Sequence, residues 1–206
     1  MRLSHTLVPM RPTGTVMIDS HALATLRYIR ASMDAARTVA VPGSAGIGVG
    51  AIGVAAAILS NGALHPYWLS TWLCAALVGA LVGAVLLAHQ SCSTGFTLSG
   101  TPVRKVFLHL MPSLVAGAVL TLVLFRSASL HAIPGTWLLL YGCALLHTSA
   151  VTTRLIAILG GVFVGLALLA FALAEAQQTL ILGIGFGAVH IFYGAVMMRR
   201  NRGAQS

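Results

Sequence analysis

Histidine is the residue type with the most chemical potential in the apolar part of this chain. A neutral imidazole can ligate a transition metal or haem iron, and it titrates near physiological pH. Four histidines fall on four different apolar runs, namely His89, His109, His147 and His190. His190 lies deepest, between Gly187 and Gly194 in the last run. The expected topology allows these four imidazoles to come together in one layer near the cytoplasmic face of a membrane.

Two of them, His190 and His147, are the candidate cofactor-binding residues. A porphyrin needs one or two axial histidines, whereas a zinc site needs three or four ligands. A proton relay is a further possibility. The plainest alternative is structural: His89 and His109 are interfacial polar residues, and His147 and His190 form hydrogen bonds with neighbouring helices. The sequence requires no cofactor, and it predicts no dedicated metal site.

Carboxylates are nearly absent, and this excludes much familiar enzyme chemistry. Asp19, Asp34 and Glu175 are the only acids, and none lies deep in an apolar run. Paired acids for glycoside hydrolysis, acid-rich metal sites and a Ser-His-Asp relay are therefore missing. An intramembrane acid for coupling transport to an ion is missing as well. We predict no catalytic residue and a protein that is not an enzyme.

The elements that carry the histidines are membrane spans. Hydrophobic residues make up 58% of the chain, charged residues 7%, and the mean hydropathy is +0.93. A soluble domain carries roughly a quarter charged residues, so this composition is that of an integral membrane protein. The predicted fold is an all-α bundle of six transmembrane helices, preceded by an amphipathic interfacial helix. The expected spans are 43–61, 67–90, 105–125, 135–151, 156–174 and 178–198, each close to the ~20 residues that cross a bilayer.

The N-terminal region precedes the six-helix domain at 42–198. Residues 1–19 are expected to be a mobile cytoplasmic segment, and residues 20–41 an amphipathic helix in the headgroup layer. Arg27, Arg30 and Arg37 would bind anionic lipid headgroups there. A docking helix for a cytoplasmic partner is the alternative. The chain would end in a basic cytoplasmic tail at 199–206.

The distribution of basic residues predicts the orientation. Eleven of the twelve Lys and Arg residues fall in the N-terminal region, the second and fourth loops and the tail, which all share one side. The positive-inside rule makes that side cytoplasmic. We therefore expect a multi-pass protein of a bacterial cytoplasmic (inner) membrane, with both termini inside. The net charge of +9 is not accompanied by a nucleic-acid-binding motif, so no nucleic-acid partner is expected.

Glycines four residues apart recur in four of the six runs. Such pairs let helix backbones approach closely, which replaces the hydrophobic force that is absent in lipid. This indicates a tight bundle, a homo-oligomer or a larger membrane complex. The predicted packing pairs are Gly46 and Gly50, Gly79 and Gly83, Gly161 and Gly165, and Gly183 and Gly187. The GxGxxG formed by Gly48, Gly50 and Gly53 lacks a preceding strand, so it is interpreted as helix packing rather than nucleotide binding.

Four short stretches carry a resemblance to a known group of proteins. They are Leu26-Arg27-Tyr28-Ile29-Arg30, Ser99-Gly100-Thr101-Pro102-Val103-Arg104-Lys105, Pro134-Gly135-Thr136-Trp137-Leu138-Leu139-Leu140-Tyr141-Gly142 and Gly185-Phe186-Gly187-Ala188-Val189-His190-Ile191. The chain resembles, over about residues 23–200, an uncharacterised family of small bacterial polytopic inner-membrane proteins. The resemblance implies a six-span topology and a bacterial origin, and it carries no activity.

The function predicted from the sequence is an accessory or scaffold subunit that acts through helix–helix contacts, as the glycine pairs and the missing catalytic groups suggest. Two alternatives remain open. One is a small permease or channel for a neutral or amphiphilic solute, indicated by six spans, Pro112 within the third span and the histidine layer. The other is a membrane subunit that binds haem, a pigment or a metal through His147 or His190.

Overall fold

The structure is a computed structural model, and its described residues are 23–28, 43–93, 101–150, 152 and 154–203. The chain divides into two compact units, Met1–Thr38 and Val39–Ser206. The described residues form helices and turns, and none of them forms a strand. The all-α class predicted from the sequence is therefore confirmed for this part of the chain.

Six helical segments among the described residues are long and apolar enough to cross a membrane. The first five are α2 (Gly43–Asn61), α3 (Trp68–Ser93), α4 (Thr101–Arg126), α5 (Ile133–Ser149) and α6 (Arg154–Ala172). The sixth is composite, with α7 (Glu175–Leu182), the π-helical segment η3 (Gly183–Val189) and α8 (His190–Gly203) in one continuous run. α8 extends to Gly203, so the first residues of the predicted tail continue the last helix.

The residues in the short connections between helices explain where η1 (His65–Tyr67) and α5 begin and where α4 ends. A proline occupies the first turn of the 3₁₀ helix η1 and of α5, where its missing N–H costs no hydrogen bond. α4 ends at a turn in which Ala128 has φ of 55°. There the Ser129 N–H donates to the Leu124 carbonyl at 2.9 Å, the long-range bond of a Schellman motif. η2 (Leu130–Ala132) then leads into α5.

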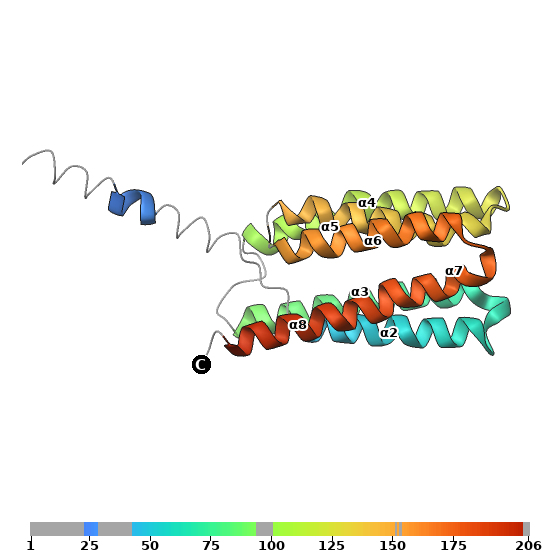
Figure 1. The fold of residues 1–206 in the computed structure, drawn as a ribbon, viewed down its shortest axis with the longest axis horizontal. Helices are drawn as coiled ribbons and strands as arrows, with labels where there is room; N and C mark the ends of the chain where they lie inside the picture. The colour runs from blue at the N-terminus through green and yellow to red at the C-terminus, as the bar shows by residue number, and fades with distance from the viewer. Residues whose placement is uncertain (1–22, 29–42, 94–100, 151, 153, 204–206) are drawn as a thin grey trace, which may run out of the picture. The chain divides into compact units, whose positions relative to one another are not determined.

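The Val39–Ser206 unit is built from two layers of helices (Figure 1). In the α2–α3–α8 layer, α2 packs against both α3 and the sixth span. In the α4–α5–α6 layer, α5 packs against both α4 and α6. α7 contacts α5 and α6 as well as α2, so the sixth span connects the two layers at the end where it begins.

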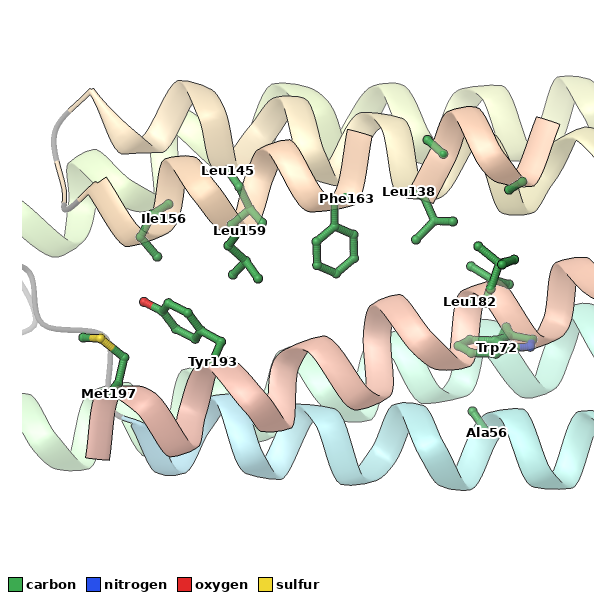
Figure 2. Packing of buried hydrophobic residues seen from close by; sticks show 13 residues of the cluster. Ala56, Trp72, Leu138, Leu145, Ile156, Leu159, Phe163, Leu182, Tyr193 and Met197 are labelled. Carbon is green, nitrogen blue, oxygen red and sulfur yellow. The ribbon is translucent and has the colours of Figure 1, made fainter. Parts of the chain in front are cut away.

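Side chains from the two layers meet in a common core. Figure 2 shows Leu138, Leu159 and Phe163 pointing from α5 and α6 toward the sixth span, and Tyr193 and Met197 pointing back from α8. Leu138 and Phe163 are completely buried. Many large apolar side chains on the outer faces are exposed, such as Leu77 at 73% and Phe192 at 73%. Such outward apolar faces are expected of a protein whose solvent is lipid.

The N-terminal unit is described only over residues 23–28, which are helical and exposed. This segment lies within the predicted amphipathic helix 20–41 and contains Arg27. The predicted mobile segment 1–19, and Arg30 and Arg37, lie outside the described residues.

Candidate functional site

Four aromatic rings gather where the two layers meet, and we call them the aromatic cluster: Tyr141 on α5, Phe163 on α6, Phe186 on η3 and His190 on α8. Each ring contacts the other three, and the centroid separations run from 4.8 Å for Tyr141–Phe163 to 6.1 Å for Phe186–His190. Tyr141 and Phe163 approach edge to face, and Phe186 and His190 are stacked with planes 16° apart. Both geometries are favourable for aromatic pairs.

His190 is 5% exposed, and its ring is held at both nitrogens. Nδ1 lies 3.1 Å from the Gly185 carbonyl oxygen, and Nε2 lies 2.9 Å from the Tyr141 hydroxyl. The first bond follows from the local backbone. Gly185 belongs to the π-helical segment that ends directly before His190, and a π-helical turn changes which carbonyls are available to neighbouring donors.

These two contacts determine the tautomer of the neutral ring. A carbonyl oxygen only accepts hydrogen bonds, so Nδ1 must carry the proton. In the neutral ring Nε2 is then the acceptor, and the Tyr141 hydroxyl donates to it. The buried imidazole is therefore fully satisfied without a charge, which a low-dielectric environment favours.

The Tyr141–His190 bond joins the two layers deep within the bundle. Tyr141 is the middle residue of α5, and the sixth span continues on both sides of His190. The other side-chain bond between layers among the described residues is from Gln178 Nε2 to the Ala170 carbonyl at 3.4 Å, close to the α6–α7 connection. His131 and Glu175 also form an exposed ion pair at that end, at 3.7 Å.

A tryptophan pair holds the same end of the layers together. Trp68 and Trp137 stack with centroids 6.1 Å apart. Each ring also donates a hydrogen bond within its own layer, Trp68 Nε1 to Thr179 Oγ1 at 2.8 Å and Trp137 Nε1 to Thr121 Oγ1 at 2.7 Å. The interface between the layers is thus aromatic at this end and in the middle.

The histidines predicted to share one layer do not all lie together in the structure. His109 and His147 contact each other, with ring centroids 4.5 Å apart. His147 lies six residues beyond Tyr141 on α5, about 9 Å along the helix axis and on a different face. No three His, Cys, Asp or Glu side chains among the described residues are placed to share a metal ion. The structure therefore does not bring His190 and His147 into one site.

A porphyrin or metal at His190 would have to displace an existing bond. Both ring nitrogens are already engaged, one by a backbone carbonyl and one by a hydroxyl. Iron ligation through Nε2 would require the Tyr141 hydroxyl to move away. The arrangement in the structure fits a hydrogen-bonded histidine between helices, which was the structural alternative for this residue.

The predicted glycine pairs occupy different environments. A Cβ on Gly46 or Gly50 would lie within 3.1 Å of backbone atoms of the sixth span, and one on Gly183 or Gly187 would meet α2. At Gly79 and Gly83 it would make ordinary contacts with Val49 at 3.9 and 3.7 Å. A Cβ at Gly161 or Gly165 would have nothing within 4 Å. These last two glycines face outward from α6.

Among the other close approaches, sequence reasoning assigned Gly53 to helix packing, through the GxGxxG motif, and missed the rest. Gly43 and Gly194 meet at the start of α2, Gly53 lies against the Phe186 carbonyl, and Gly142 and Gly160 bring α5 and α6 together. Gly43, Gly46, Gly50 and Gly53 follow alternating steps of three and four residues, a helical-face signal that a search for four-residue pairs overlooks. Tyr141, Phe163 and Phe186 were not predicted as site residues either. No family model, curated protein or solved structure matches the chain.

Proposed function

We propose that this protein is a small permease for a neutral or amphiphilic solute, in which the two layers separate and close around the aromatic cluster. The observation that supports this most directly is the bond between buried His190 and Tyr141 of the opposite layer, formed beside a π-helical segment. An ionisable side chain at membrane depth is costly and is usually retained for function. Breaks in regular helix at membrane depth are common at transport sites, and π-helical turns are frequent at functional sites.

The chemistry of the cluster supports an uncharged solute. The one carboxylate of the spans, Glu175, is exposed at the start of α7 and pairs with His131, so no carboxylate lies in the aromatic cluster to bind a cation. After separation, the neutral pair offers one donor, the Tyr141 hydroxyl, and one acceptor, Nε2 of His190. Three aromatic faces would contact an apolar portion of the solute. No catalytic role is proposed for these residues.

A flux assay tests this proposal. Purified protein in liposomes should release a neutral or amphiphilic solute from a broad panel faster than empty liposomes do. His190→Ala should abolish that release, and His65→Ala, at an exposed histidine of η1, should leave it unchanged. Release that is equal in both variants, or absent for the whole panel with the folded wild-type protein, would contradict the permease proposal.

An accessory or scaffold subunit is the second candidate, and one observation favours it. The outward-facing Gly161 and Gly165 lie beside exposed Ile158, Val162 and Leu168, so α6 offers a surface that allows close backbone approach. We propose that a second copy of the chain binds this surface of α6, because small-residue pairs associate well with an identical pair. Cysteine at position 161 in an otherwise cysteine-free protein should then form a disulfide dimer in native membranes, and Gly165→Leu should prevent it.

The membrane setting is part of the proposal. We infer a bacterial cytoplasmic membrane with both termini inside, supported by the distribution of basic residues. Arg27, Arg30 and Arg37 would contact anionic headgroups on that side.

A further inference from the structure

His109 and His147 form a contact pair that the proposed transport site does not use. His109 lies on α4 and His147 in the last turn of α5, two helices that pack side by side in one layer (Figure 1). Their ring centroids are 4.5 Å apart and their planes meet at 61°. Two imidazoles from adjacent helices thus lie face to edge at one end of the bundle.

Both rings have nitrogens available for a ligand. Within the described part of the chain, neither imidazole forms a hydrogen bond or an ion pair, in contrast to His190. His147 is exposed in the last turn of α5, and His109 is half-buried near the start of its span, so the pair is accessible from that end of the bundle. A neutral imidazole with an open nitrogen is a good ligand for Zn²⁺, Cu²⁺ and Ni²⁺.

The spacing of the pair suits a shared ion. Two imidazoles on one tetrahedral ion, with metal–nitrogen bonds of ~2 Å, have centroids about 5 Å apart. The observed centroid separation is 4.5 Å, about half an ångström shorter. A small rotation of the exposed His147 side chain is enough to provide this difference. We propose that His109 and His147 bind one divalent transition-metal ion between α4 and α5, with water completing its coordination.

The proposal is independent of the permease. A two-imidazole site has fewer protein ligands than a structural or catalytic zinc site, so we expect it to exchange its ion readily. A bound ion would fix the ends of α4 and α5 to each other, without contact with the aromatic cluster.

The test is a Zn²⁺ titration of the untagged full-length protein in detergent, in competition with a chromophoric chelator. Wild-type protein should bind an ion that is lost in His109→Ala and in His147→Ala. Even an outer-shell change weakens metal sites by about 10–100-fold, so removing a ligand should weaken binding by at least about tenfold. His65→Ala should bind like the wild type.

A second variant separates ligand loss from misfolding. Cysteine is a zinc ligand, so His147→Cys should retain the binding that His147→Ala loses. X-ray absorption at the zinc edge should show imidazole nitrogens in the wild type and one sulfur in His147→Cys. Equal affinities in the wild type and in His109→Ala, or no competition by the wild type at all, would overturn the proposal.

Discussion

The hydroxyl of Tyr141 lies 2.9 Å from Nε2 of His190, and this contact connects the two helical layers deep in the bundle. Because the Gly185 carbonyl fixes the proton on Nδ1, the neutral imidazole is the acceptor and the tyrosine the donor. Both partners are surrounded by Phe163 and Phe186. His190 is 5% exposed, so these rings shield the bond from solvent, and a double-mutant cycle can isolate its contribution to stability.

A double-mutant cycle tests this contact. Tyr141→Phe should lower the free energy of unfolding by about 0.5–2 kcal/mol, because it leaves Nε2 without a donor. The same substitution in the background of His190→Ala should cost measurably less, since the acceptor is already gone. Tyr67→Phe, at an exposed tyrosine, is the matched control. Equal effects of Tyr141→Phe in both backgrounds would show that the hydroxyl and the imidazole are not coupled.

Glycines that look alike in the sequence should respond differently to alanine. A Cβ at Gly53 would lie 2.4 Å from the Phe186 carbonyl oxygen, so Gly53→Ala should destabilise the protein by about 1–3 kcal/mol or more. At Gly161 the new methyl group meets nothing within 4 Å, and alanine is the better helix former. Gly161→Ala should therefore be neutral or stabilising. Thermal unfolding of both variants in the same detergent measures the difference. A larger loss of stability in Gly161→Ala than in Gly53→Ala would contradict the conclusion that Gly53 is packed and Gly161 faces outward.

The sequence was sufficient for the spans because lipid imposes a simple rule on every segment. An apolar run of about 20 residues in lipid has to be helical, and all six predicted runs overlap the helical segments that are long and apolar enough to cross a membrane. The aromatic cluster was harder to predict, since it depends on which helices become neighbours. Tyr141 and His190 are 49 residues apart, and nothing in either local pattern indicates the other. The π-helical turn that supplies the Gly185 carbonyl is equally invisible, because three nearby glycines are compatible with an ordinary helix.

Two tryptophans offer a test of hydrogen bonding against burial. Trp72 is 3% exposed, but its Nε1 has no hydrogen-bond partner among the residues that the structure describes, whereas the less buried Trp68 donates to Thr179. Replacing an unpaired buried donor removes an unfavourable group, while Trp68→Phe loses a bond and leaves the Thr179 hydroxyl unpaired. Both substitutions remove the same ring volume, so this loss is similar in the two variants. We therefore expect Trp68→Phe to lower the free energy of unfolding by about 1 kcal/mol more than Trp72→Phe. Burial alone predicts the opposite order, so the ranking of the two unfolding midpoints distinguishes these explanations.

The turn after α4 contains a position where glycine should be an improvement. Ala128 has φ of 55°, in the left-handed region that costs a residue with a Cβ roughly 1 kcal/mol. Ala128→Gly should stabilise the protein by up to about 1 kcal/mol, reduced by the greater freedom of glycine in the unfolded chain. Ala118, exposed in the interior of α4, is the control, and glycine there should destabilise because it is the poorer helix former. Destabilisation by glycine at both 118 and 128 would mean that the left-handed turn is not retained in solution.

The orientation of the protein in the membrane can be tested by labelling cysteines placed at the two ends of the bundle. In a cysteine-free background, a cysteine in place of His65 lies between α2 and α3, and one in place of Arg200 lies near the end of α8. These positions are at opposite ends of the bundle, because five spans separate them. The positive-inside rule puts the basic end in the cytoplasm, so a membrane-impermeant maleimide should label position 65 in intact cells and position 200 only after lysis. Labelling of position 200 in intact cells, with position 65 protected, would reverse the topology and with it the side from which a metal ion reaches His109 and His147.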